Sequence, residues 1–206
     1  KLFKIIDFIK SSYNSEIEYR VCVDTSPIME KFWGQNSGLG WMGKHTNLIN
    51  KNLGSWFFLS EILLDIDLVF DLSFEEDLCG TCTKCIDLCP TGSLTPYVLD
   101  SNKCISYLTI EHKGEFQKEY SDKFNDWIYG CDICQEVCPW NLKNELITSE
   151  RSFHIKPELD SMTKEDWESL TKENYTKILR KSAMKRAKYD NLMRNILVNK
   201  EKKEED

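Results

Sequence analysis

Residues 79–90 read CGTCTKCIDLCP, a cysteine-rich stretch that determines how the chain around it can fold. Its cysteines follow the pattern C-x2-C-x2-C-x3-C-P, the bacterial-type spacing for 4Fe–4S clusters. The first three thiolates, spaced along a tight loop, can hold three irons of one cubane cluster. The fourth, Cys89, begins a helix that points elsewhere, so it is expected to bind an iron of a neighbouring cluster.

A second run, CDICQEVCP at residues 131–139, lacks one cysteine, because Ile128 stands where a full run would begin. Cys104, between the two runs, is the remaining candidate to replace it. The sequence therefore predicts two clusters, each taking its fourth ligand from the other run. One cluster is assigned Cys79, Cys82, Cys85 and Cys138, and the other is assigned Cys89, Cys104, Cys131 and Cys134.

Other uses of the nine cysteines fit the pattern less well. No export signal is visible, and eight cysteines crowd between Cys79 and Cys138, so a metal framework is favoured over disulfides. A zinc site would use two CxxC pairs and leave both Cys-Pro positions unexplained. Cys22 lies in an apolar strand and is expected to be a buried structural thiol.

The 206 residues are 41% hydrophobic and 30% charged, a composition typical of a soluble folded protein. The longest apolar stretch, residues 55–70, is interrupted by acidic residues, so neither a membrane span nor a membrane partner is expected. Residues 1–171 carry 16 Lys and Arg against 28 Asp and Glu, whereas residues 172–200 carry 9 against 2. An acidic body with one basic segment favours a polyanion contact on one face, although a solvated helix face would look the same.

The chain divides into three consecutive sections that differ in composition and in hydrophobic pattern, and together they predict an α+β fold. Residues 1–75 are expected to be part of an α/β catalytic domain, residues 76–145 a ferredoxin-like two-cluster domain, and residues 146–206 a helical segment. The first section should hold helices at 1–10 and 28–35, strands at 19–24, 46–50 and 55–60, and a glycine-rich loop at 37–44. The last section should hold helices at 164–170, 175–186 and 191–199. Because Lys1 lies inside the first section, the chain is expected to be a fragment.

Four stretches together resemble the epoxyqueuosine reductase family over nearly the whole chain. They are residues 23–27 (VDTSP), 38–46 (GLGWMGKHT), 104–114 (CISYLTIEHKG) and 130–141 (GCDICQEVCPWN). The last two are far more specific than the cysteine runs alone. The family's glycine-rich loop usually reads GKN, whereas this chain has His45 in the third place, and the family's upstream third is absent.

The resemblance implies a cobalamin-dependent enzyme that reduces epoxyqueuosine to queuosine at the wobble position of tRNA. Residues 1–75 would then be the C-terminal part of the cobalamin-binding catalytic domain, and residues 146–206 a HEAT-like helical segment. Electrons would come from an external donor through the two 4Fe–4S clusters to cobalamin. No histidine is expected as a cobalt ligand. The residues that would lie near cobalamin are Gly43, Lys44, Thr46 and Ser55.

Asp24 occupies the position of the family's proton donor. An epoxide oxygen leaves poorly until it is protonated, so the reaction needs a general acid. Asp24 follows the apolar strand 21–23, where partial burial would keep its carboxyl group protonated. The alternative is a structural role as a helix N-cap before Ser26 and Pro27.

The resemblance also implies contacts with tRNA that carries epoxyqueuosine in its anticodon loop. The segment between the cysteine runs could stack on bases or meet phosphate, and the basic segment near the C-terminus could follow an RNA backbone. The residues assigned to tRNA are Ser106, Tyr107, His112, Lys113, Lys181, Lys185 and Arg186.

Three rival functions share some of these features. A reductive dehalogenase also joins a corrin to two clusters, but it is usually exported and has little use for a basic end. A two-cluster ferredoxin-type electron-transfer module needs neither the Asp24 region nor the glycine-rich loop. A structural iron–sulfur domain in a nucleic-acid enzyme would hold clusters that do not cycle in redox. The tRNA reductase is favoured, as a cytoplasmic monomer.

Overall fold

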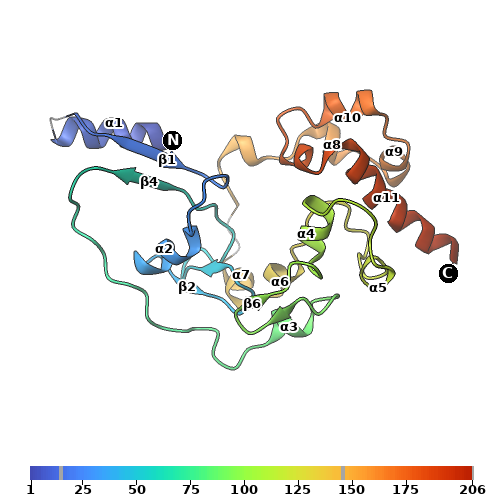
Figure 1. Cartoon of the computed structure of the whole chain (residues 1–206), viewed down its shortest axis with the longest axis horizontal. Coiled ribbons are helices and arrows are strands. Elements are labelled where there is room, and N and C mark those ends of the chain that lie inside the picture. Colours follow the sequence, from blue (N-terminus) through green and yellow to red (C-terminus); the bar gives the residue numbers. More distant parts are fainter. Residues whose placement is uncertain (14–15, 145–146, 206) are drawn as a thin grey trace.

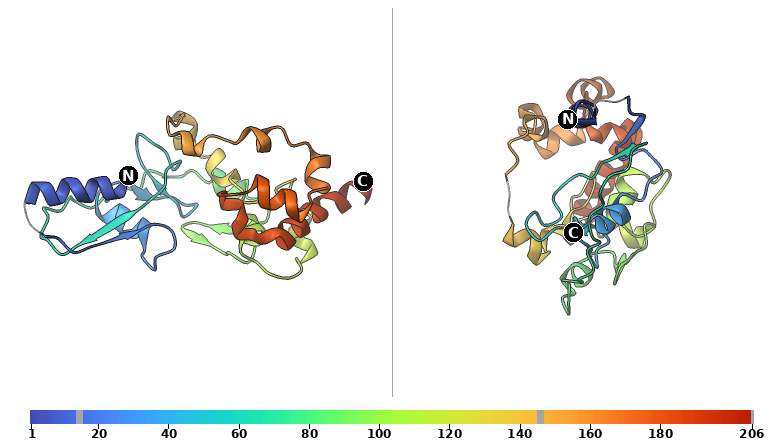
Figure 2. Two further views of the ribbon diagram at one scale, coloured as in Figure 1. Left: turned by 90° about the horizontal axis from the view of Figure 1, so that it is seen from above. Right: turned by 90° about the vertical axis from the view of Figure 1, so that its left-hand side faces the viewer.

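The computed structural model describes residues 1–13, 16–144 and 147–205, and the predicted boundary between residues 145 and 146 lies outside them. Figure 1 shows N-terminal helices and strands on one side, C-terminal helices on the other, and the cysteine-bearing helices below and between them. Figure 2 shows the first helix and the C-terminus at opposite ends of the molecule. The predicted mixture of helices and strands is confirmed, whereas the three domain assignments stay predictions.

The N-terminal section combines short helices with antiparallel strand pairs. Its elements are α1 (Leu2–Tyr13), β1 (Tyr19–Cys22), α2 (Glu30–Asn36), β2 (Trp41–Met42), β3 (Leu48–Ile49) and β4 (Glu61–Leu64). β1 pairs with β4, with Tyr19 opposite Leu64, and β2 pairs with β3, with Trp41 opposite Ile49. The predicted helices at 1–10 and 28–35 and the strands at 19–24 and 46–50 are therefore confirmed in shorter or slightly shifted form.

The predicted strand at 55–60 is wrong, because strand pairing begins only at Glu61. The backbone N–H of Ser55 donates to Oδ1 of Asn141, 2.6 Å away, instead of to a neighbouring strand. The side chain of Asn141, which belongs to the cysteine-rich section, thus accepts the hydrogen bond from a backbone N–H that would otherwise pair with a neighbouring strand. The turn before it is closed by paired hydrogen bonds between Asn50 and Gly54.

The cysteine-rich section is built from short helices and one hairpin: α3 (Lys84–Asp87), β5 (Leu94–Thr95), β6 (Val98–Leu99), α4 (Ile105–Ile110), α5 (Lys118–Ser121), α6 (Ile133–Glu136) and α7 (Pro139–Lys143). One core cluster joins Trp41 and Ile49 of the N-terminal section to Cys138, with Phe74 and Trp140 packed against it. The rings of Trp41 and Trp140 meet edge to face, with centroids 4.9 Å apart. The first two sections therefore share a core.

The C-terminal section is helical, as predicted. Its elements are the 3-10 helix η1 (Arg151–Phe153), α8 (Pro157–Asp160), α9 (Lys164–Glu168), α10 (Lys172–Ile178), the 3-10 helix η2 (Ala183–Ala187) and α11 (Lys188–Glu205). A single helix over 175–186 is wrong, because Lys181 has a left-handed φ of 61° that interrupts the helix between α10 and η2. Among the described residues, every helix is too short or too polar to cross a lipid bilayer.

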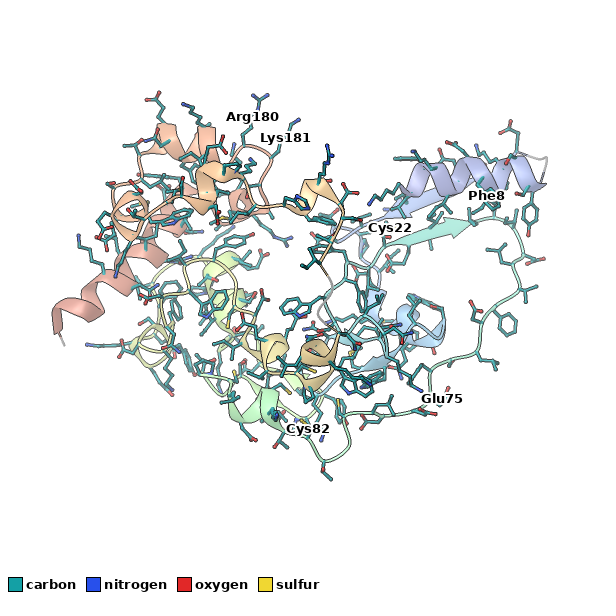
Figure 3. The ribbon with its side chains drawn as sticks, turned by 180° about the vertical axis from the view of Figure 1, so that it is seen from behind. Phe8, Cys22, Glu75, Cys82, Arg180 and Lys181 are labelled. Atoms are coloured by element: carbon teal, nitrogen blue, oxygen red, sulfur yellow. The ribbon has the colours of Figure 1, made fainter. Side chains whose placement is uncertain are left out.

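The outer part of the N-terminal section buries little apolar surface. Within α1 only Ile6 is buried, and Phe8 on the same helix is exposed. The extended segment after β4 exposes Val69, Phe70 and Leu72 almost completely. Figure 3 shows this segment running around the edge of the molecule until it returns to the rest of the chain near Glu75.

Candidate functional site

The first predicted group of cysteines lines one cavity of about 150 Å³. Cys79 and Cys82 come from the loop before α3, Cys85 from α3 itself, and Cys138 from the residue before α7. Cys85 and Cys138 are buried, while the other two are partly exposed. Figure 3 shows Cys82 near the edge of the molecule, far from Arg180 and Lys181. We call these four residues the first quartet.

The second predicted group lines a neighbouring cavity of about 220 Å³. Cys89 follows α3, Cys104 lies at the N-terminus of α4, Cys131 lies in the loop before α6, and Cys134 belongs to α6. We call these four residues the second quartet. The structure therefore groups the eight cysteines in the two sets that the spacing predicts.

No group of three or more His, Cys, Asp or Glu side chains in the described part of the chain converges on a single metal ion. A cubane cluster has a different requirement, because each thiolate binds its own iron and the four sulfurs surround the cluster. Four cysteines around a shared cavity meet this requirement. Thiolates are also the ligands that hold iron–sulfur clusters, so the donor set fits such a group.

Burial and crowding raise the pKa of four of these thiols, Cys85, Cys131, Cys134 and Cys138, and so make them hard to ionise without a bound cation. Burial, and after it the negative charge of the neighbouring cysteines of its own quartet, raises the pKa of Cys85 to about 11. Burial likewise raises the pKa of Cys134 to about 12, with Cys131 and Cys104 as the next causes. The positive charge of bound iron would offset this crowding, because a coordinated thiol is deprotonated outright.

The thiol of Cys89 is shifted in the opposite direction from these four. Burial acts to raise the pKa of its thiol, but hydrogen bonds from Ser93 and Thr91 outweigh it and lower the pKa. The Sγ atom lies 3.1 Å from Oγ of Ser93 and 3.4 Å from its backbone nitrogen. The chain thus supplies donors to this sulfur before any cluster is bound.

The loop of the first quartet is held by Lys44. Its Nζ donates to the backbone carbonyls of Gly80 and Cys82, at 2.6 and 3.0 Å. The side chain of Asp77 accepts a hydrogen bond from the backbone N–H of Cys79 at 2.9 Å. Lys44, which the resemblance assigns to cobalamin, therefore anchors cysteine-bearing backbone in this structure.

Ser55, also assigned to cobalamin, is buried in a network with Asn141 and Gln135. Its Oγ donates to Oε1 of Gln135 and accepts from Nδ2 of Asn141, each at 2.9 Å. Gly54 beside it has a φ of +64°, and a Cβ there would lie 2.1 Å from Oδ1 of Asn141. The network ties the N-terminal section to α6 and α7.

The four residues assigned to cobalamin do not come together in either of the two cysteine cavities. Lys44 lies at the cavity of the first quartet and Thr46 at that of the second. Gly43 and Ser55 are buried and line neither of these two cavities. Their joint contact with a corrin stays a prediction.

Asp24 is exposed, so the expected burial of its side chain is wrong. Its φ is 52°, and its Oδ2 lies 3.0 Å from Nη1 of Arg186, which belongs to η2. Nε of Arg186 also contacts Oε1 of Glu111, at the end of α4, at 2.5 Å. The alternative N-cap role is wrong for α2, because Met29 occupies its N-cap position. Asp24, Glu111 and Arg186 therefore form one corner shared by three sections; we call it the Asp24 corner.

The residues assigned to tRNA are divided among several places. Ser106 lines the cavity of the second quartet, and Tyr107 and Lys113 are exposed. The ring of His112 stacks on Phe116, with its Nε2 3.0 Å from the carbonyl of Glu115. Lys181 and Lys185 are exposed, and both lie within a few residues of Arg186 in the sequence. No single described cavity gathers them, and their tRNA contacts stay predictions.

Two residues of α11 hold the segment between the cysteine runs and were not assigned from the sequence. Arg194 donates to the carbonyls of Leu108, His112 and Gly114 and lies 3.9 Å from the ring centroid of Phe116. The signal available in the sequence was a polar pair, Arg194 and Asn195, within an otherwise apolar helical stretch.

Asn195 joins the two segments that carry cysteines of the second quartet. Its Nδ2 donates to the carbonyls of Thr109 and Ile128, both at 2.8 Å. Oγ1 of Thr109 in turn accepts from the backbone N–H of Gly130 at 2.9 Å. Because α4 follows Cys104 and Gly130 precedes Cys131, this buried network fixes one segment relative to the other.

His45 is buried between the two cavities and lines both of them. Burial lowers the pKa of its imidazole to about 4, so the ring is neutral at ordinary pH. Its Nδ1 accepts a hydrogen bond from the backbone N–H of Asn47 at 3.1 Å. Its Nε2 is buried without a hydrogen-bond partner among the described residues.

Comparison with known proteins gives a consistent result. The family model described as a 4Fe–4S double cluster binding domain matches residues 78–141, which include all eight cysteines of the quartets. The epoxyqueuosine reductase of Cellulophaga algicola is 48% identical over 197 residues, which is 95% of the chain and 63% of that protein.

Two solved structures share the fold. An epoxyqueuosine reductase with an epoxyqueuosine-modified tRNA-Tyr stem loop has a TM-score of 0.86 and 29% identity, covering 96% of the chain and 52% of that protein. The epoxyqueuosine reductase of Bacillus subtilis, in a structure with its catalytic aspartate loop swung out of the active site, has a TM-score of 0.85 and 27% identity. The match covers 96% of the chain and 51% of that protein. The chain spans about three fifths of the length of the curated relatives it matches.

Proposed function

Because the chain belongs to the epoxyqueuosine reductase family, we propose that the protein reduces epoxyqueuosine to queuosine in tRNA. The observation that carries this proposal is the pair of four-cysteine cavities in a chain homologous to those enzymes. The reaction takes two electrons and two protons: the epoxide loses its oxygen as water, and an alkene remains. The chain has to hold the electron carriers, supply a proton and bind RNA.

The two quartets are proposed to hold one 4Fe–4S cluster each. When bound, such clusters transfer electrons one at a time. The chain's part is to fix the thiolates: Lys44 holds the loop of the first quartet, and Asn195 holds the segments of the second. The core around Trp41 excludes water from Cys138.

Asp24 is proposed to deliver a proton to the epoxide oxygen. In this structure its carboxylate faces Arg186, so it has to leave this ion pair before it can act as an acid. The ion pair is exposed, and pairs of this kind contribute about 0–1 kcal/mol, so releasing it costs little. The solved relative with its catalytic aspartate loop swung out supports a loop that moves.

The exposed basic residues near the C-terminus are proposed to contact the tRNA backbone. Lys177, Arg180, Lys181, Lys185 and Lys188 are all exposed. Contacts with phosphate would make the affinity for tRNA fall steeply with salt. The tRNA stem loop in the solved relative supports this partner.

Cobalamin is proposed as the second cofactor on the strength of the homology. The residues assigned to it are engaged in internal hydrogen bonds or line separate cavities, so they do not form a corrin site by themselves, and we derive no step through it. We also propose that the protein works as a cytoplasmic monomer with an external electron donor.

The test is a turnover assay on the full-length protein, prepared anaerobically with cobalamin and a reductant. It is incubated with tRNA that carries epoxyqueuosine, and the digested nucleosides are weighed by mass spectrometry. Loss of one oxygen from the modified nucleoside is expected. No conversion, with clusters and corrin bound and reducible, would favour a dehalogenase-like reaction. If no corrin binds, an electron-transfer module becomes the better account.

A further inference from the structure

His45 presents a buried hydrogen-bond donor with nothing to donate to. Its side chain is 3% exposed and lies in the walls of both cysteine cavities. Since Nδ1 accepts from the backbone N–H of Asn47, the ring proton is assigned to Nε2. That N–H has no partner among the described residues. A buried donor left unsatisfied destabilises a protein, so an acceptor absent from the polypeptide is expected here.

The composition of the two walls indicates which cavity holds this acceptor. The cavity of the second quartet is lined by several oxygen acceptors, among them Thr91, Ser93 and Asp132. The cavity of the first quartet is lined by Lys44, apolar side chains and cysteines, so sulfur is the acceptor its side chains offer. Nε2–H forms a hydrogen bond with none of the oxygens in the second wall, which favours the first cavity, where a cluster sulfur would be the acceptor.

The packing of the His45 ring also favours the cavity of the first quartet. A Cβ on Gly43 would lie 3.0 Å from Cε1 of His45 and 2.6 Å from Cδ1 of Ile49, and Ile49 lines the cavity of the first quartet. A second buried N–H without a partner among the described residues, Nε1 of Trp41, belongs to the core around Cys138. Among the described residues, the core around the first quartet therefore holds one buried donor without a partner, Nε1 of Trp41, and its cavity wall includes a second, Nε2 of His45.

We infer that Nε2–H of His45 donates a hydrogen bond to a sulfur atom of the cluster held by the first quartet, and so raises the reduction potential of that cluster. Reduction adds negative charge to the cluster, and a donor to its sulfur stabilises the more negative state. His45 would thus contact the cluster without binding an iron. The inference rests on the proposed cluster binding by the first quartet, but not on the reaction or on tRNA.

The direct test uses the full-length protein with both clusters in place and leaves His45 unsubstituted. The protein is labelled with 15N-histidine, reduced to the paramagnetic state and studied by pulsed electron paramagnetic resonance. The signal of the first-quartet cluster is identified as the one that changes in Cys82→Ser. A hyperfine coupling from a histidine nitrogen to this signal, with an exchangeable proton, is expected. Absence of such a coupling would overturn the inference.

Potentiometric titration of matched variants gives the second readout. His45→Phe removes the donor but keeps a ring, and His45→Gln keeps an N–H. The Phe variant should make the reduction potential of the first cluster more negative. At a fixed applied potential, the ratio of reduced to oxidised cluster should fall on the order of tenfold, which corresponds to about 59 mV for a one-electron couple. The Gln variant should stay near the wild type, as should the exposed control His154→Phe.

The outcomes separate this inference from the proposed cluster binding. Iron and sulfide content, measured on each variant, report cluster binding independently of the potential. Equal potentials in the wild type and His45→Phe, with full iron content, would overturn the hydrogen bond and leave cluster binding intact. A shift confined to the second cluster would also contradict the assignment.

Discussion

The two quartets and Asp24 were all predicted from the sequence to be functional, and the structure holds them in different ways. Cys85 and Cys138 are buried, and the surrounding backbone is fixed by Lys44 and Asn141. Asp24 is exposed on a loop and is held by one ion pair with Arg186. The difference corresponds to the proposed tasks: a cluster needs fixed ligands, whereas an acid has to approach its substrate and leave it.

The largest effect is expected from removing a ligand of the first quartet. Cys85→Ala should lose the iron of one cluster, because the remaining thiols cannot complete a four-ligand site. Iron and sulfide analysis with the visible absorption spectrum measures the loss. The matched control is Cys22→Ala, which removes an equally buried thiol outside both quartets and should keep the full iron content. Full iron content in Cys85→Ala would contradict the assignment.

A smaller but clear loss of stability is expected where Gly54 meets Asn141. Gly54→Ala would place a Cβ 2.1 Å from Oδ1 of Asn141 at a left-handed φ, so we expect the free energy of unfolding to fall by about 1–3 kcal/mol or more. Gly92→Ala is the control, because Gly92 has a similar φ of +61° but open space around it. Equal losses in the two variants, measured by denaturant unfolding, would show that the contact with Asn141 is unimportant.

Asn195→Ala should separate the segments of the second quartet. Two backbone carbonyls, those of Thr109 and Ile128, would lose their partner inside the protein, at about 1–3 kcal/mol for an unsatisfied buried group. The expected result is a lower melting temperature together with weaker iron retention by the second cluster. The exposed control Asn102→Ala should change neither quantity. A variant with unchanged melting temperature and normal iron content would show that Asn195 of α11 does not hold the segments of the second quartet together.

The smallest effect on stability is expected at the Asp24 corner. A double-mutant cycle of Asp24→Ala and Arg186→Ala should give a coupling energy of about 1 kcal/mol or less, because the pair is exposed. By contrast, Asp24→Asn should abolish most turnover, since an amide cannot supply the proton. A coupling well above this range would indicate that the corner is as firmly held as the quartets.

The quartets could be predicted from the sequence because the spacing within each cysteine run decides which thiolates face one cluster, and the pattern of two paired runs indicates which distant cysteines complete each set. The Asp24 corner could not, because its partner Arg186 is distant in sequence and nothing near Asp24 indicates it. The strand expected at 55–60 failed for a similar reason, since Asn141 captures the backbone of Ser55. The helix break at Lys181 could not be predicted from the hydrophobic pattern. The left-handed φ of this lysine is determined by how the segments on either side of it pack.

The crossed assignment of ligands is the central claim, and a pair of variants within the second cysteine run tests it most directly. Cys134 and Cys138 lie one helical turn apart but line different cavities. In the reduced full-length protein, Cys138→Ser should perturb the same electron paramagnetic resonance signal as Cys82→Ser, and Cys134→Ser the same signal as Cys89→Ser. If Cys134→Ser and Cys138→Ser perturb one and the same signal, the crossed assignment is wrong.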